Sequence, residues 1–280
     1  MAPFLCQYAQ TMLTIRLGCS ALVLLFAASS VTAQAVPRKG KLLRDMTWME
    51  ARDQFTPDTV IVVPLGAEAK EHGPHLPLGN DWNMAEYLKD RVLRDANVIV
   101  APTINYSFYP TFVEYPGSTH LRLETARETI VDISTSLAKH GPKRIYILNT
   151  GVSTLRPLSA AAEVLAKQGI LMRFTDILRV AGEVEKQVRQ QKEGTHADEI
   201  ETSWMLYAKP ETVNMSKASA DYPTGQGPLT PNKNVPGRYS PSGIFGDATL
   251  ATKEKGEKIV EATVTGVLKE IEELRLARLP

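Results

Sequence analysis

The run Val60-Ile61-Val62-Val63-Pro64-Leu65 is apolar throughout, and the polar segment Gly66-Ala67-Glu68-Ala69-Lys70-Glu71-His72-Gly73-Pro74-His75-Leu76-Pro77-Leu78-Gly79-Asn80-Asp81 follows it at once. A strand with no polar alternation is typical of a parallel sheet that is covered on both faces. In such sheets, ligand sites form beyond the carboxyl ends of the strands. These two segments therefore predict an α/β domain with functional residues directly after a central strand.

The chain on either side repeats this alternation of apolar runs and helical patterns. Further strands are expected at residues 98–102, 144–149 and 170–174. Helices are expected at residues 82–95, 123–140, 155–168 and 177–191, and a last one at residues 252–276. We predict a single α/β domain, with a mostly parallel sheet and helices on both of its faces.

The first 35 residues have the pattern of a secretory signal peptide. Arg16 precedes the apolar residues 17–28, and small residues ending in Ala33-Gln34-Ala35 follow. The apolar run is too short for a comfortable membrane span, which needs about 20 residues; an uncleaved anchor is the alternative. We therefore expect residues 1–35 to be removed, leaving a domain of residues 36–280 in the periplasm or outside the cell, with no membrane contact.

Composition limits the partners and the ligands. The chain of 280 residues has a formal net charge of +1, so it offers no basic field for nucleic acid. Both cysteines, Cys6 and Cys19, lie in the predicted signal peptide. A metal ion in the mature domain would therefore be held by His, Asp and Glu.

Two later segments stand out. His196-Ala197-Asp198-Glu199-Ile200-Glu201-Thr202-Ser203 gathers acid and base groups at the start of an expected helix. Alone, such acids are usually helix caps, and a lone histidine is usually structural. Residues 216–246 are rich in Pro, Gly, Ser and Asn, and a loop of that length is more often a lid or an oligomer contact than a plain connection.

Taken in order, these motifs resemble those of the creatininase (creatinine amidohydrolase) family. The resemblance rests on Glu71-His72-Gly73-Pro74-His75-Leu76-Pro77 with Asp81, on His196-Ala197 with Glu201-Thr202-Ser203, and on Gly243-Ile244-Phe245-Gly246-Asp247-Ala248-Thr249. It covers roughly residues 47–256, and the first motif is the most specific.

The resemblance implies an oligomeric α/β hydrolase with a centre of two divalent ions, zinc or manganese, that cleaves cyclic or linear amides. It implies that His72 binds one ion and that Asp81 bridges both. His196 and Glu201 would be the catalytic residues on the substrate side, with His196 transferring a proton and Glu201 orienting it.

Two departures from the family pattern concern the metal centre. Lys70 stands where the family has a glutamate, so Glu71 or Glu68 would have to replace that ligand, and Glu71 is favoured. Gly151 stands where the family has a histidine. Glu199, Glu201 or His120 could substitute for it, and the resemblance leaves open whether one or two ions bind.

Other residues have weaker assignments. The aromatic residues 106–117 fall where relatives place a substrate-facing loop, and Tyr115 and Trp82 are predicted to bind substrate. Trp204 is expected to pack in the core, His75 to be structural, and His140 to interact with a helix end.

These observations predict an exported, homo-oligomeric, metal-dependent amidohydrolase acting on a small, possibly cyclic, amide. The alternative is a non-catalytic binding protein that keeps the fold with a degenerate metal site. Gly151 favours that alternative, whereas His72, Asp81, His196 and Glu201 argue against it.

Overall fold

The structure is a computed structural model that describes residues 38–280. The predicted signal peptide and both cysteines lie outside the described residues. Within them, no helix combines the length and the apolar composition needed to cross a membrane.

The main sheet has five strands, all parallel, in the order β1-β3-β2-β4-β5. Their bounds are β1 Lys41–Leu42, β2 Val60–Leu65, β3 Ile99–Val100, β4 Arg144–Asn149 and β5 Leu171–Phe174. β2 and β4 are buried along their whole length, as their largely apolar sequences predict. They pair from Val60 with Arg144 to Leu65 with Asn149, so both strands end at the same level. The segments that follow them therefore leave the sheet side by side.

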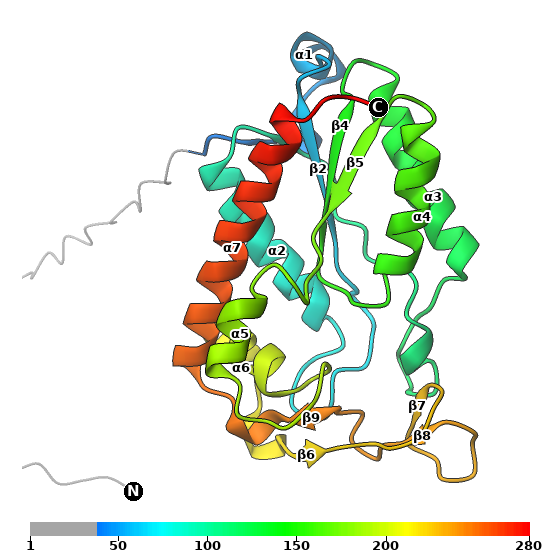
Figure 1. Cartoon of the computed structure of the whole chain (residues 1–280), viewed down its shortest axis with the longest axis vertical. Coiled ribbons are helices and arrows are strands. Elements are labelled where there is room, and N and C mark those ends of the chain that lie inside the picture. Colours follow the sequence, from blue (N-terminus) through cyan, green and yellow to red (C-terminus); the bar gives the residue numbers. More distant parts are fainter. Residues whose placement is uncertain (1–37) are drawn as a thin grey trace, which may run out of the picture. The chain divides into compact units, whose positions relative to one another are not determined.

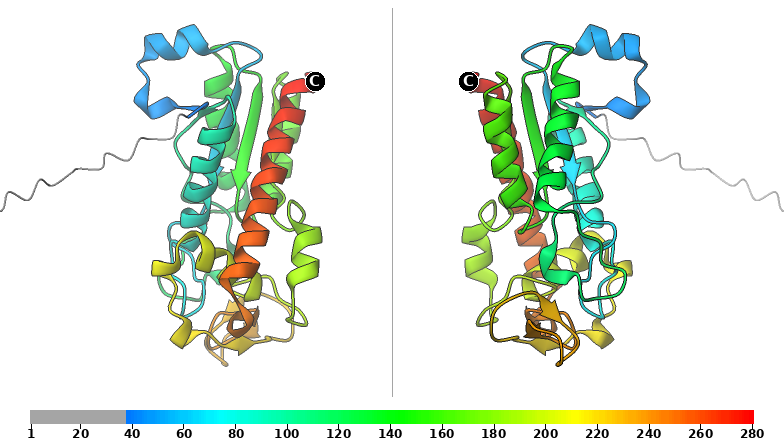
Figure 2. Two further views of the ribbon diagram at one scale, coloured as in Figure 1. Left: turned by 90° about the vertical axis from the view of Figure 1, so that its left-hand side faces the viewer. Right: turned by 90° about the vertical axis from the view of Figure 1, so that its right-hand side faces the viewer.

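Helices cover both faces of this sheet (Figures 1 and 2). Val60 and Val62 of β2 pack with α2, α6 and α7 on one face, and Ile61 and Val63 pack with α3 and α4 on the other. The helix bounds are α2 Asn80–Asp95, α3 Leu123–Ala138, α4 Leu155–Ala166, α6 Glu199–Ala208 and α7 Lys253–Leu276. The predicted fold class, a mostly parallel α/β sheet with helices on both faces, is confirmed.

The two remaining helices are short. α1 (Trp48–Gln54) begins at a capping box in which Thr47 and Glu50 hydrogen-bond to each other's backbone amides. α5 (Gly182–Val188) is shorter than the predicted helix over residues 177–191. The reason is a turn in which the Asp176 carboxylate accepts a hydrogen bond from the amide of Leu178 at 3.2 Å. Such side-chain contacts compete with helix formation.

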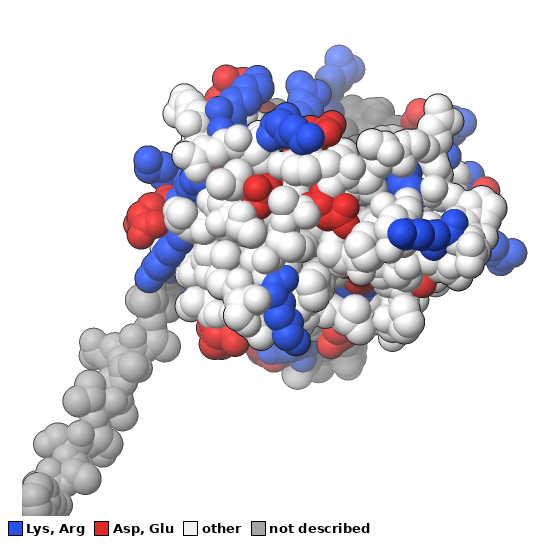
Figure 3. Space-filling view, turned by 90° about the horizontal axis from the view of Figure 1, so that it is seen from below, with Lys and Arg blue, Asp and Glu red and all other residues white. Residues whose placement is uncertain are grey.

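The long loop over residues 216–246 lies at the carboxyl end of the sheet (Figure 1). It contains two small sheets, formed by β6 (Ala220–Asp221) with β9 (Gly246–Asp247) and by β7 (Leu229–Thr230) with β8 (Arg238–Tyr239). The buried hydroxyl of Ser240 donates to Asp221 at 2.7 Å and accepts from the amide of Gly243 at 2.8 Å. Figure 3 shows this end of the molecule, where charges of both signs are scattered without a patch of one sign.

Candidate metal centre

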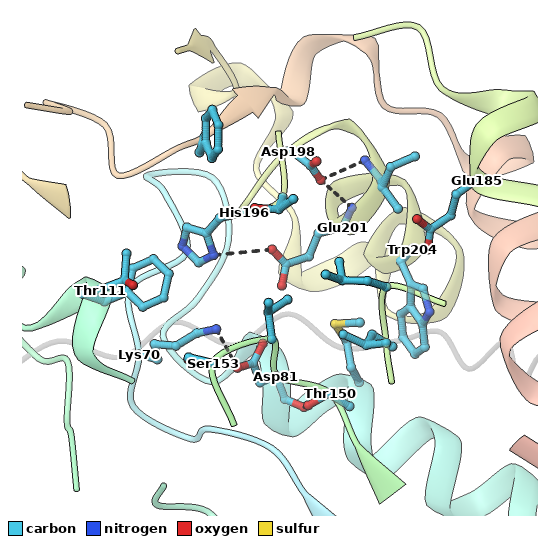
Figure 4. A pocket seen from close by; sticks show the side chains of 18 of the residues that line it. Lys70, Asp81, Thr111, Thr150, Ser153, Glu185, His196, Asp198, Glu201 and Trp204 are labelled. Atoms are coloured by element: carbon cyan, nitrogen blue, oxygen red, sulfur yellow. Dashed lines mark hydrogen bonds and ion pairs between the residues drawn. The ribbon is translucent and has the colours of Figure 1, made fainter. Parts of the chain in front are cut away.

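The polar residues of both motifs come together beyond the ends of β2 and β4. The loop after β2 supplies Lys70, Glu71 and His72, and the first turn of α2 supplies Asp81. His196 precedes α6, and Glu201 lies in its first turn, facing the same space (Figure 4). The two segments are far apart in sequence, and the fold makes them neighbours.

His72 is buried and held by a backbone carbonyl. Its Nδ1 lies 2.8 Å from the carbonyl oxygen of Lys70, which can only accept, so Nδ1 carries the proton of this hydrogen bond. Its Nε2 faces Asp81 Oδ1 at 2.9 Å and Glu201 Oε1 at 3.4 Å. An imidazole fixed in this way, with the other nitrogen turned toward carboxylates, has the usual surroundings of a metal ligand.

His196 is held by Glu71. Its Nε2 lies 2.9 Å from Glu71 Oε2, and the other oxygen of Glu71 accepts from the amide of Gly73. The ring of Phe112 packs against that of His196 at 4.0 Å between centroids. Burial opposes ionisation of Glu71, but the charge and hydrogen bond of His196 outweigh it, and the pKa of Glu71 is lowered. Glu71 is thus a carboxylate that orients an imidazole.

The start of α6 determines where Glu201 points. Asp198 caps the helix, accepting from the amides of Ile200 and Glu201 at 3.0 Å each. The Glu201 carboxylate accepts from Asn80 Nδ2 at 3.0 Å and from the amide of Ala197 at 2.6 Å. Its Oε2 lies 3.9 Å from His196 Nδ1. Glu201 therefore stands between the two imidazoles.

These three side chains suit a divalent ion. One donor atom from each of His72, His196 and Glu201 lies within 4.8 Å of the others. Two imidazole nitrogens and one carboxylate oxygen form a donor set that zinc accepts, with a position left for water or substrate. The residues present therefore fit one ion.

Asp81 makes a different contact. Its Oδ2 lies 2.7 Å from the ammonium Nζ of Lys70, and both side chains are buried. Burial alone would raise the pKa of the Asp81 carboxyl, but the charges of Lys70 and His72 hold that pKa well below its usual range. Asp81 is therefore an ionised partner of Lys70 as well as of His72.

The structure separates the predicted replacement ligands. Glu71, the favoured replacement, is not one of the three residues of this donor set; its oxygens face His196 Nε2 and the amide of Gly73, and its role as a ligand stays a prediction. Glu68 is exposed and bonds to Asn105 at 2.8 Å.

Of the three candidates for the ligand missing at Gly151, Glu201 alone is in the donor set. Glu199 is buried against Lys255, and His120 Nδ1 accepts from the amide of Tyr109 at 3.1 Å.

A cavity of about 220 Å³ opens onto the centre. In Figure 4, Lys70 and Asp81 lie on one side of it, and Glu185 and Trp204 lie on the other. Neither Trp82 nor Tyr115, the two predicted substrate-binding residues, is on its wall. Tyr115 is buried, and its hydroxyl donates to the carbonyl of Ser240 at 2.8 Å, so it anchors the long loop.

Phe112 is the aromatic residue of the 106–117 segment that reaches the cavity, and the sequence alone did not single it out. Its position at a short 3₁₀ turn after Pro110 is visible only in the fold.

His75 bonds to Thr202 at 2.8 Å, and burial lowers its pKa to about 4, which keeps it uncharged at neutral pH. Trp204 is buried, with its ring edge-on to Tyr87.

Comparison with known proteins identifies the family of this chain. A model of the creatininase family, described as creatinine amidohydrolase, matches residues 44–271, and the chain belongs to this family. Creatinine amidohydrolase of Pseudomonas putida is 25% identical over 84% of this chain and 97% of its own length. Mycofactocin precursor peptide peptidase of Mycolicibacterium smegmatis is 28% identical over 74% of this chain and 82% of its own length.

The solved structures show the same fold. A mutant creatininase complexed with creatine superimposes with a TM-score of 0.70 at 24% identity, covering 86% of this chain and all of that one. A manganese creatininase has a TM-score of 0.70 at 24% identity, and the match covers 84% of this chain and 99% of that one. The predicted family is confirmed, and these relationships support a hydrolase of C–N amide bonds.

Proposed function

We propose that the protein is a metal-dependent amidohydrolase that cleaves a C–N amide bond in a small molecule. The observation that carries this proposal is the set of two buried histidines, His72 and His196, and the half-buried Glu201 beside a cavity in a chain of the creatininase family. Solved relatives include manganese and zinc forms of creatininase, so we propose zinc or manganese.

The chain's own residues would prepare the site before substrate arrives. The Lys70 carbonyl and the Glu71 carboxylate fix the two imidazoles by hydrogen bonds at 2.8 and 2.9 Å. Asn80 and the Ala197 amide hold Glu201. A divalent ion bound there would polarise an amide carbonyl and lower the pKa of water toward about 7. One water would be consumed, giving a carboxylate and an amine.

The cavity supports a small substrate. Its volume of about 220 Å³ and its apolar wall favour a compact amide over a long polymer; the apolar lining includes Val152, Leu178, Ile200 and Phe245. Because one relative is a peptide peptidase, a short peptide amide belongs in the substrate screen beside lactams, hydantoin-like rings and N-acyl compounds.

The test combines metal analysis with that screen. We expect the wild type to hold a divalent ion and to hydrolyse one of these amides, and His72→Ala to lose both properties. His140→Ala is the matched control, because His140 is exposed at the end of α3. A wild type that takes up no ion and cleaves nothing would leave the non-catalytic binding protein as the better description.

His196 has a sharper test, because its position beside His72 and Glu201 supports a second role, as a donor to the ion. As a donor to the ion, His196→Ala should lose the ion together with the activity. If the variant keeps its ion and loses about 10²–10⁴-fold in kcat instead, His196 transfers a proton, as the sequence predicts.

We also propose that the chain is exported and forms homo-oligomers. Amino-terminal sequencing of the protein from a periplasmic fraction tests the first proposal, and an intact Met1 would contradict it. Light scattering of the purified protein tests the second, and a monomer at all concentrations would contradict it.

A further inference from the structure

Lys70 is a buried cation in the middle of a candidate metal centre. Its side chain is only 7% exposed, and its Nζ lies 2.7 Å from Asp81 Oδ2. The rings of Tyr109 and Phe112 lie 5.4 and 5.0 Å from the same nitrogen. Removing a charge from water costs several kcal/mol unless a close partner of opposite charge compensates. The carboxylate and the two aromatic faces provide that compensation.

The backbone directs this ammonium into the site. The amide of Lys70 donates to the carbonyl of Leu78 at 3.0 Å, which closes the loop between β2 and α2. The carbonyl of Lys70 holds His72, and the carbonyl of Asp81 accepts from the Thr150 hydroxyl at 3.2 Å. Both partners of the ion pair are thus tied to the scaffold on which the centre is built.

The charges of the centre balance with one ion. Glu71, Asp81 and Glu201 carry three negative charges, and one divalent ion with the Lys70 ammonium carries three positive ones. A second divalent ion would add two uncompensated positive charges close to Lys70, where repulsion in a buried site is strong. Two other carboxylates line the cavity, but Glu185 faces Arg189 and Asp198 is the helix cap.

The segment after β4 also brings no imidazole or carboxylate to the cavity wall that could bind a second ion. The segment after β4 contributes Thr150, Val152 and Ser153 to the wall, and Gly151 has no side chain. Asp81 itself is engaged on both oxygens, by His72 on Oδ1 and by Lys70 on Oδ2.

We propose that Lys70 is a built-in cation that holds Asp81 and excludes a second metal ion, so that each chain binds one divalent ion. The site then has two positive groups: a divalent ion, which can exchange with solvent, and the Lys70 ammonium, which is part of the chain. This inference concerns the number of ions and stands independently of the substrate and of the proposed hydrolysis.

The first test needs no variant. Purified wild-type protein is titrated with zinc, and the bound metal is counted by elemental analysis and by native mass spectrometry. We expect one equivalent per chain. Two equivalents held with comparable affinity would overturn the proposal, whether or not any amide is cleaved. One equivalent without hydrolysis would leave this inference intact and count against the proposed function.

The second test reverses the charge. Lys70→Glu replaces the ammonium with a carboxylate beside Asp81, and we expect a second equivalent of zinc to bind. Lys139→Glu is the matched control, because Lys139 is exposed at the end of α3 and should leave the count at one. Circular dichroism with zinc present checks folding. A folded Lys70→Glu protein that still binds one equivalent would overturn the role of Lys70, and if it fails to fold, the wild-type count decides.

Discussion

Gly243→Ala should damage the centre although Gly243 is not part of its donor set. Gly243 has φ = +78°, and a Cβ at this position would overlap the carboxylate of Glu71, with Oε2 only 2.7 Å away. Glu71 would have to move, and it holds His196. The left-handed backbone costs an L-residue about 1–2 kcal/mol. Losing a hydrogen bond to a charged group adds about 1.5–3 kcal/mol, which gives about 2.5–5 kcal/mol in total.

Gly169→Ala separates the two contributions. Gly169 has a similar φ of +70°, but nothing lies within 4 Å of the position of its Cβ. It should therefore show only the backbone cost of about 1–2 kcal/mol. Urea unfolding compares the free energies of unfolding of the two variants, provided that their m-values are equal. Zinc retention should fall in Gly243→Ala alone. If the two variants unfold within about 0.5 kcal/mol of each other and both keep the ion, the contact with Glu71 does not support the centre.

Two further predictions concern carboxylates outside the donor set. Lys255→Met removes the cation beside the fully buried Glu199 and should lower the free energy of unfolding by about 3 kcal/mol. Lys269→Met is the control, because Lys269 belongs to an exposed ion pair, and it should cost less than about 1 kcal/mol. Urea unfolding measures both. Burial, with a smaller effect of Asp198, raises the pKa of Glu185 from 4.5 to about 7. Because the unfolded chain releases this proton first, stability should fall as pH rises from 4.5 to about 7. Glu185→Gln should flatten that fall in thermal unfolding, and an unchanged profile would contradict the assignment.

The central strands are the part of the fold that sequence patterns predict well. The predicted strands over residues 60–65 and 144–149 have largely apolar sequences, which favour strands covered on both faces, and β2 and β4 have those bounds. The predicted strand over residues 98–102 shrinks to Ile99–Val100. Pro102 has no N–H to donate to a ladder, and β1 offers only two residues for pairing.

The centre is harder to predict because its partners depend on the path of a loop. Motifs identify His72, His196 and Glu201, but they do not reveal which carboxylate faces which nitrogen. Glu71 lies between Lys70 and His72 in the sequence, so its neighbours do not indicate its partner. Only the folded loop turns it toward His196. The sequence shows that Lys70 departs from the family pattern. Its pairing with Asp81 is not visible there, because it requires the loop to fold back over α2.

The distance in sequence between the two halves of the centre has a consequence for assembly. Glu71 and His196 are 125 residues apart, and an unfolded chain would pay a loop-closure entropy to bring such segments together. The proposed ion should therefore bind the native state more tightly than the unfolded chain. At a free concentration a hundredfold above its Kd, an ion that binds only the native state adds about 2.7 kcal/mol to the free energy of unfolding.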